Sequence, residues 1–265
     1  MGNRTQVFKD YLIEARQGGT YVGASEEDLN QAEKLFQQMF RGEDNDELIS
    51  NWKKLGFELI KTRYLAKQIT IIQEQSDKKM GRGFYAFQQL GLGNALQAPH
   101  SESDLHTGAI VQTLFLHHQF AAAGWNTVQR RQADVAHLPK TYFMAFSKAF
   151  AKEMPERYLI QLHGFSEEKR SSMEGKETQF IISNGTKSPS HALMKMNNCL
   201  RNLTIPTRIY PIDIKELGAT TNVIGKMLRS INFQGFIHLE MSAGIRKALI
   251  HQPDLIMKLK DCIPE

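Results

Sequence analysis

The chain has 265 residues, of which 41% are hydrophobic and 23% charged, a composition ordinary for a globular protein with a sizeable core. Its formal net charge is +5, which favours either general solubility or a cleft that attracts acidic substrates. No block of five or more basic residues occurs, and no apolar run approaches the roughly 18 residues of a membrane span. We therefore expect neither nucleic acid nor a membrane as partner.

The two cysteines, Cys199 and Cys262, lie far apart and outside any metal-ligand spacing, which predicts no disulfide framework. The N-terminus lacks the apolar region of a Sec signal peptide. Together these features favour a reducing, cytoplasmic compartment, with export by a non-classical route as the alternative.

Residues 1–66 are predicted to form a polar, N-terminal helical extension. Ser25 followed by acids at 26–28 is typical of a helix N-terminus. The hydroxyl accepts a hydrogen bond from an unpaired backbone N–H group, and the acids interact favourably with the positive end of the helix dipole. Gly42 ends this helix, and a second helix is expected from about 46 to 62. No residue of the extension indicates catalysis.

Residues 67–265 alternate between apolar runs and amphipathic segments, which predicts one α/β domain whose mixed, largely parallel sheet is flanked by helices. Pro211 places its strand near an edge of the sheet. The expected strands cover 67–75, 83–87, a short run ending before Pro99, 124–131, 158–165, 180–185, 207–212 and 235–241. The expected helices cover 109–123, 139–152, 188–203, 221–231, 242–251 and 253–260.

The loop after Pro99 carries a cluster of side chains able to bind a metal. Ligands of open α/β sheets bind beyond the carboxyl ends of the strands, which is where this loop lies. His100 and Asp104 are four residues apart, a spacing that brings both to one side of a helical turn. Glu102 is a rival carboxylate ligand, and the alternative role for Asp104 is to cap the following helix.

Other predicted strands also end in polar residues, namely Arg130, Arg131, His163, Asn184 and Glu240. Two histidines and one carboxylate are a standard ligand set for a catalytic zinc, with the fourth position left to water. A single histidine at a strand end is more often structural, but a carboxylate such as Glu240 within an apolar strand is costly unless it is paired or metal-linked. The coincidence of His100, His163 and Glu240 favours a zinc site with Glu240 as general base and an arginine that holds a substrate carboxylate. Whether His137 or His238 also reaches this site is left open.

Short motifs between residues 96 and 249 follow one another in a distinctive order. They are Pro99-His100, Asp104, Thr107-Gly108, 125–130, 134–137, 161–165, 183–185 and 236–241. In this order they resemble the N-formylglutamate amidohydrolase and zinc carboxypeptidase group. The resemblance implies a mixed sheet flanked by helices and a zinc ion held by His100, Asp104 and His163. It also implies Glu240 as general acid/base and Arg130 as the group that binds the substrate or the oxyanion.

These observations predict a zinc-dependent hydrolase that cleaves an amide bond in a peptide-like or N-acyl amino-acid substrate bearing a carboxylate. Arg131 and Asn184 are expected to assist substrate binding. The carboxypeptidase metal motif has a glutamate three residues after its first histidine, and this chain has Ser103 there. The alternatives are therefore a binding or scaffold relative without activity, and an esterase or phosphodiesterase that uses the same metal. The sequence predicts no oligomeric state.

Overall fold

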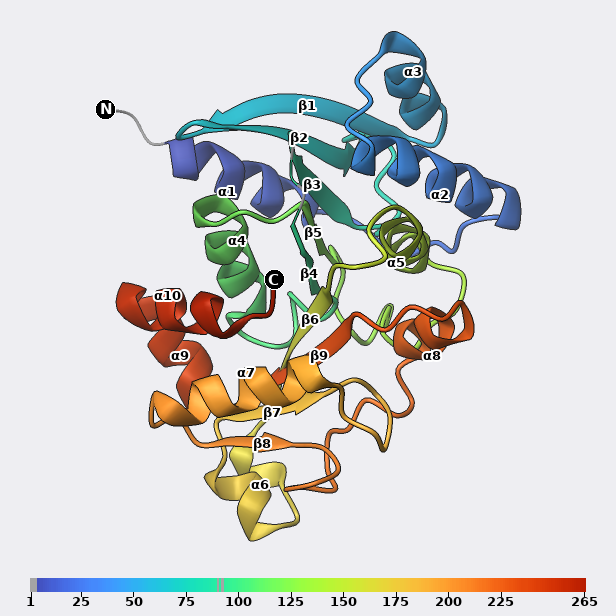
Figure 1. Ribbon diagram of the computed structural model, residues 1–265. Helices are drawn as coiled ribbons and strands as arrows, with labels where there is room; N and C mark the ends of the chain where they lie inside the picture. The colour runs from blue at the N-terminus through green and yellow to red at the C-terminus, as the bar shows by residue number, and fades with distance from the viewer. Residues whose placement is uncertain (1–3, 90, 92) are drawn as a thin grey trace.

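The computed structural model describes residues 4–89, 91 and 93–265. Among these residues, nine β-strands form one mixed sheet, and helices pack on both of its faces (Figure 1). Of the helices in this part of the chain, none combines the length and apolar character that a membrane crossing needs.

The elements follow the predicted alternation closely from residue 67 onward. The strands are β1 (Phe57–Tyr64), β2 (Lys67–Glu74), β3 (Phe84–Gln88), β4 (Ala95–Ala98), β5 (Ala122–Trp125), β6 (Leu159–Gly164), β7 (Phe180–Ser183), β8 (Thr207–Ile209) and β9 (Phe236–Met241). The helices are α1 (Arg4–Ala15), α2 (Glu26–Phe40), α3 (Asp46–Lys54), α4 (Thr107–His117), α5 (Tyr142–Glu153), α6 (Met173–Glu177), α7 (His191–Asn202), α8 (Val223–Ser230), α9 (Ala243–His251) and α10 (Pro253–Cys262), and a 3-10 turn covers Glu167–Lys169.

The strands are ordered β1-β2-β3-β5-β4-β6-β9-β7-β8 across the sheet. Counted over the described residues, four neighbouring pairs are parallel and four are antiparallel. The mixed α/β architecture is confirmed, but the prediction of a largely parallel sheet is wrong. The connections from β1 to β2 and from β2 to β3 are too short for a crossover, which needs about a dozen residues or more. The edge position predicted for the strand before Pro211 is confirmed, because β8 ends the sheet.

Three of the four parallel pairs lie in the centre, where β5, β4, β6 and β9 are neighbours, and the fourth joins β7 to the edge strand β8. Their carboxyl ends therefore meet at one edge of the sheet, where ligands of α/β proteins bind. β7 pairs antiparallel with β9 and closes this block on the far side. The four central strands thus position the loops on which function was predicted.

Each face of the sheet is covered by its own set of helices (Figure 1). Helices α1, α4, α7, α9 and α10 bury one apolar cluster against the strands. Helices α2, α3, α5 and α8 bury a second cluster on the opposite face. Aromatic rings dominate the second cluster, in which Phe36 packs edge-on against Trp52, Tyr85 and Phe146.

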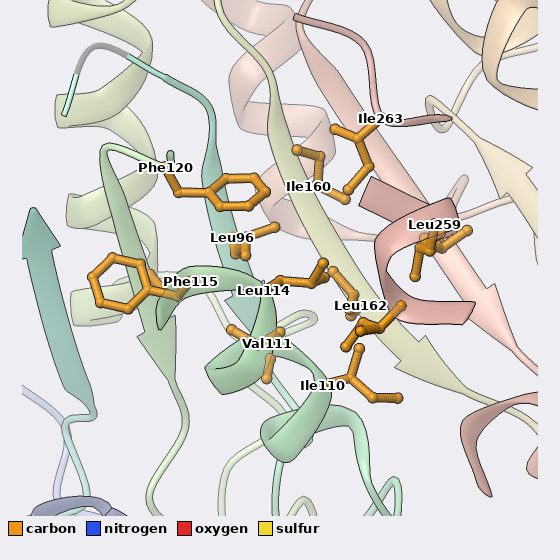
Figure 2. Close-up of a cluster of buried hydrophobic side chains, with 14 of the residues drawn as sticks. Leu96, Ile110, Val111, Leu114, Phe115, Phe120, Ile160, Leu162, Leu259 and Ile263 are labelled. Carbon is orange, nitrogen blue, oxygen red and sulfur yellow. The ribbon is translucent and has the colours of Figure 1, made fainter. Parts of the chain in front are cut away.

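Helix α4 shows why the segment after the predicted metal loop is helical. It is apolar on most sides and is buried between the sheet and α10. Its helical structure is therefore stabilised by tertiary packing rather than indicated by an alternation of apolar and polar faces. Figure 2 shows Ile110, Val111 and Leu114 of α4 lying beside Leu96 of β4 and Leu162 of β6. This packing fixes the end of the loop that carries the candidate ligands.

The N-terminal region differs from the helical extension that was predicted. Helix α3 ends at Lys54, and Gly56 with φ of +85° turns the chain into β1. Residues 57–64 therefore form a strand that pairs with β2, and the boundary predicted at residue 66 falls in the turn between them. The prediction of a helix from 46 to 62 is wrong after residue 54.

Strand β5 also ends earlier than the 124–131 predicted, at Trp125. The side chain of Asn126 donates to the carbonyl oxygens of Pro99 and Ala133, at 3.0 and 3.1 Å. These bonds fold residues 126–133 back toward the loop after β4. The polar residues expected at the strand end therefore lie in a loop beside His100 instead.

Cys199 of α7 and Cys262 of α10 form a disulfide across 63 positions, with Cα atoms 5.4 Å apart. The prediction of no disulfide is wrong, because separation along the chain says nothing about two helices that pack together on one face of the sheet. Disulfides are rare in cytosolic proteins, so one argument for a reducing compartment is removed.

Candidate metal centre

Three neighbouring strands change from apolar to polar residues on the same face as they approach their carboxyl ends. Alternate residues of a strand share a face, and β4, β6 and β9 are parallel, so their polar side chains gather at one edge. All of them are buried, and buried polar groups require partners. These residues are Gln97 on β4, Gln161 and His163 on β6, and His238 and Glu240 on β9.

The loop from β4 to α4 adds His100 and Asp104 to this edge. The backbone N–H groups of Ser103 and Asp104 both donate to the carbonyl oxygen of His100 at 2.8 Å, which curls the loop into a turn. Oδ2 of Asp104 accepts the backbone N–H of Gly164 at the end of β6, at 2.9 Å. The Asp104 carboxylate is thus held against β6 rather than at the start of α4.

Three donor atoms face one another where the loop meets β6. Nδ1 of His100 lies 3.2 Å from Nδ1 of His163 and 3.2 Å from Oδ2 of Asp104. The three side chains each offer one ligand atom within 4.8 Å of the others. In a tetrahedral zinc site with bonds of about 2.0–2.1 Å, neighbouring ligand atoms are roughly 3.3 Å apart. The donor set and its spacing therefore fit a metal ion.

A second carboxylate holds His100 from the other side. Oδ1 of Asp134 lies 2.9 Å from Nε2 of His100 and 3.0 Å from Nδ1 of His137, and Arg130 donates Nε to Oδ2 at 2.8 Å. Burial raises the pKa of Asp134, but hydrogen bonds to His100, His137 and Arg130 outweigh it, so the pKa lies below its ordinary value. Metal-binding histidines commonly donate their second nitrogen to such a carboxylate, which leaves Nδ1 of His100 for the metal.

The two candidate histidine ligands differ in their preference for charge. Burial lowers the pKa of His100, but hydrogen bonds to Asp104 and Asp134 outweigh it and raise the pKa above its ordinary value. Burial lowers the pKa of His163 well below its ordinary value, and the neighbouring imidazoles of His238 and His100 lower it further. Asp104 and Asp134 therefore favour a positive charge on the ring of His100, whereas the lowered pKa of His163 favours its neutral form, the form in which histidine binds a metal.

Glu240 and His238 lie beside His163 on the next strand. His163 is opposite Glu240 in the β6–β9 register, and the rings of His163 and His238 have centroids 4.3 Å apart. Nε2 of His238 lies 3.0 Å from Oε1 of Glu240. Within the described chain, Nδ1 of His238 and Oε2 of Glu240 are buried without a hydrogen-bond partner. One oxygen of Glu240 is thus uncommitted next to the donor set.

A cavity of about 600 Å³ is lined by the candidate ligands together with His238 and Glu240. Cationic side chains also line it, namely Arg130, Lys169, Arg170, Lys215 and Arg246. Arg246 donates to the carbonyl oxygens of Leu105 and Phe165, at 2.7 and 3.0 Å, and so ties the loop between β4 and α4 to the end of β6. The side chain of Arg130 is 49% exposed. This excess of cations favours anionic ligands.

The structure brings together most, but not all, of the predicted site residues. Those that line the cavity are His100, Asp104, His163, Glu240 and Arg130. Within the described residues, Arg131 and Asn184 do not line it, and Asn184 donates to Ser188 in its own loop at 3.0 Å. The structure thus gives no support to their predicted roles in substrate binding. Glu102 pairs with Arg16 at 2.8 Å and lies outside the donor group, so Asp104 is the carboxylate that joins His100.

Sequence reasoning assigned no role to Asp134. It lies in the motif 134–137, but its contact with His100 depends on the fold of the loop after β5. The question left open for His137 and His238 is answered, because both line the cavity. The buried Gln161 was visible only as a polar residue inside an apolar strand.

Comparison with known proteins does not identify a family. No family model matches the chain, and no curated protein matches it. One similar solved structure is that of a "putative metallopeptidase" from Shewanella amazonensis, with 9% sequence identity, coverage of 92% of this chain and 95% of that chain, and a TM-score of 0.38. A likeness that low does not establish a shared fold, so function has to be inferred from this chain's own residues.

Proposed function

We propose that this protein is a zinc-dependent hydrolase that cleaves an amide bond in a peptide-like or N-acyl amino-acid substrate bearing a carboxylate. The proposal extends the resemblance of its motifs to the N-formylglutamate amidohydrolase and zinc carboxypeptidase group. The observation that carries it is the convergence of His100, Asp104 and His163 at the spacing of zinc ligands. Ser103 replaces the glutamate of the carboxypeptidase motif, but Asp104 supplies a carboxylate one position later.

His100 and His163 would hold the zinc through Nδ1, and Asp104 through its carboxylate. A bound zinc ion lowers the pKa of a coordinated water to about 7 and polarises a carbonyl oxygen. Asp134 would fix the ring of His100 by accepting its Nε2–H. The chain therefore supplies three ligands and a carboxylate partner for one of them.

Glu240 is the proposed general base. Its Oε2 is buried, unpartnered among the described residues and adjacent to the donor set, while Oε1 is held by His238 at 3.0 Å. A carboxylate fixed at one oxygen accepts a proton from water at the other and returns it to the leaving nitrogen. His238 would keep the Glu240 carboxylate in this orientation.

Arg130 is the proposed group for the substrate's carboxylate. Its Nε is committed to Asp134, and its half-exposed side chain lines the cavity. A guanidinium offers five N–H donors, so a tethered arginine still has donors for a second carboxylate. Lys169 and Lys215 line the same cavity and would add to its attraction for anions.

Metal analysis tests the proposal first. Elemental analysis of wild type and of the His100→Ala, His163→Ala double variant, both purified without added metal, is expected to show near-stoichiometric zinc only in wild type. Glu240→Gln is expected to keep the zinc and to lower turnover of N-acyl amino acids by about 10²–10⁴-fold, the usual contribution of a general base.

Other results would point elsewhere. No zinc in wild type, even after zinc is supplied, overturns the metallohydrolase. Bound zinc without turnover of any amide favours the binding or scaffold relative. Ester or phosphodiester products with no amide cleavage favour the third hypothesis on the same metal.

A further inference from the structure

A hydrogen-bonded series of buried polar side chains runs behind the candidate metal centre. It joins the hydroxyl of Ser147 on α5 to the amides of Gln97 on β4, Gln161 on β6 and Asn222, the residue that caps the start of α8. Each of these side chains is at most 1% exposed. Gln161 is also 3.3 Å from Nε2 of His163, so the orientation of its amide decides which atom the histidine meets.

At the Asn222 end of this series, a backbone donor fixes the orientation of the Gln161 amide. The backbone N–H of Gly225 can only donate, and it donates to Oδ1 of Asn222 at 2.9 Å. The amide nitrogen of Asn222 is therefore the atom that faces Gln161, and it donates to Oε1 of Gln161 at 2.8 Å. From this end, Gln161 presents its oxygen toward Asn222 and His163.

At the Ser147 end of the series, a backbone acceptor fixes the Gln161 amide in the same orientation. The carbonyl oxygen of Phe143 can only accept, and it receives the hydroxyl hydrogen of Ser147 at 2.7 Å. Ser147 must then accept from Nε2 of Gln97, at 3.0 Å, which turns Oε1 of Gln97 toward Gln161. Nε2 of Gln161 donates to that oxygen at 2.8 Å. Two independent anchors thus agree on the orientation of Gln161.

The consequence reaches His163. Its Nε2 faces an oxygen and must carry the ring hydrogen, since a neutral imidazole has one donor and one acceptor nitrogen. Nδ1 therefore holds the lone pair, and Nδ1 is the atom that lies 3.2 Å from Nδ1 of His100. The lone pair is presented to the position where the donor atoms converge.

We infer that Asn222 and Gln161 are positioning residues that fix His163 as the Nε2–H tautomer and so keep its Nδ1 lone pair available to a metal ion. The part of this inference that concerns metal binding rests on the proposed function. The tautomer assignment rests on the oxygen that Gln161 presents to Nε2 of His163, and Nδ1 of His100 is the competing partner against which the experiment decides.

The experiment uses the full-length, metal-free protein labelled with ¹⁵N-histidine. Long-range ¹H–¹⁵N correlation spectra distinguish the nitrogen that carries hydrogen from the one that does not, and His163→Gln identifies the signals of this ring. Wild type is expected to show hydrogen on Nε2 of His163. Zinc affinity is measured on the same proteins by competition with a chromophoric chelator.

Two single-atom exchanges have opposite expected results. Asn222→Asp keeps an oxygen for Gly225 but sets a carboxylate against Oε1 of Gln161. Repulsion between these oxygens is expected to turn the amides of Gln161 and Gln97 against the neutral anchor at Ser147, so that Gln161 turns its NH₂ group outward and the hydrogen of His163 moves to Nδ1. Gln161→Glu keeps an oxygen toward His163 and is expected to retain the Nε2–H form. Asn197→Asp is the matched control, because it buries the same charge on α7, where the side chain is 3% exposed.

Zinc affinity is expected to fall about 10–100-fold in Asn222→Asp, the usual effect of losing an outer-shell partner, and to be retained in Asn197→Asp. Hydrogen on Nδ1 in wild type, or an unchanged tautomer in Asn222→Asp, overturns the inference. If Asn222→Asp does not fold, the spectra of wild type and Gln161→Glu still decide it. The expected tautomer in a wild type that binds no zinc overturns the proposed function and leaves the tautomer assignment standing.

Discussion

Asp134 is predicted to set the affinity for the metal without binding it. Its carboxylate accepts from Nε2 of His100 at 2.9 Å and is itself held by Arg130 and His137. His100 is 2% exposed, so water does not replace this partner when it is lost. Asp134→Asn removes the charge and leaves one oxygen for three donors. Loss of such a partner typically weakens metal binding by about 10–100-fold, or roughly 1.4–2.8 kcal/mol.

The assay is competition for zinc between the protein and a chromophoric chelator at fixed pH. Glu102→Gln is the matched control, because Glu102 is on the same loop but pairs with Arg16 at 2.8 Å. It is expected to bind zinc as wild type does. An Asp134→Asn protein that is folded and binds zinc with unchanged affinity would refute the reasoning that this carboxylate orients His100. Weaker binding in Glu102→Gln alone would make Glu102 the carboxylate ligand.

Three further predictions concern the scaffold. Replacing Cys199 and Cys262 by serine should lower the free energy of unfolding by about 4 kcal/mol, from the loop entropy of a 63-residue separation, and an unchanged urea midpoint would contradict this. Leu114→Ala, in the core of α4, should lower it by about 2–5 kcal/mol, whereas Met173→Ala, at a side chain that is 64% exposed, should stay within about 0.5 kcal/mol. Burial lowers the pKa of Lys67 from 10.5 to about 8. Between these pH values the unfolded chain binds more protons than the folded protein, so the stability contributed by Lys67 rises with pH. NMR titration of ¹³C-methylated lysines should show a midpoint near 8 for Lys67, and a midpoint near 10.5 would contradict this.

Most strands could be predicted because their signal is local. Apolar or alternating runs bounded by turn residues identify β2, β3, β6 and β9 within a few residues. Strand β1 could not, because Leu55, Leu59 and Ile60 also continue the helical spacing of Leu48 and Trp52. What makes 57–64 a strand is its partner β2, and such pairing is not visible in a local pattern.

The direction of several strands and the disulfide were missed for the same reason. Half of the neighbouring pairs in the described sheet are antiparallel, and that depends on which strands become neighbours. Cys199 and Cys262 meet only because α7 and α10 pack on the same face. The spacing of residues along the chain predicts neither the direction of neighbouring strands nor the contact between the two cysteines.

Some residues of the candidate site could likewise be predicted from the sequence, and one could not. His100, His163 and Glu240 could be found because each lies in or directly after a strand whose end was predictable. Asp134 could not, because it lies in a loop placed by Asn126, whose side chain bonds the carbonyl oxygen of Pro99 at 3.0 Å. That bond brings the loop to His100, a contact that the motif 134–137 does not show by itself.

The distribution of hydrogen bonds argues that this polar cluster serves a ligand rather than the stability of the sheet. Gln97 and Gln161 are buried, and each uses both its amide nitrogen and its oxygen. On β4, β6 and β9 of the described chain, the buried side-chain atoms without a partner are Nδ1 of His238 and Oε2 of Glu240. Each unsatisfied buried group costs about 1–3 kcal/mol. Such atoms occur elsewhere in the described chain, for example on Trp52 and Tyr142, so what distinguishes His238 and Glu240 is their place in the cavity beside the donor set. The network is complete behind the donor set and incomplete at two residues that line the cavity, which is the arrangement expected where a metal, a water and a substrate are to bind.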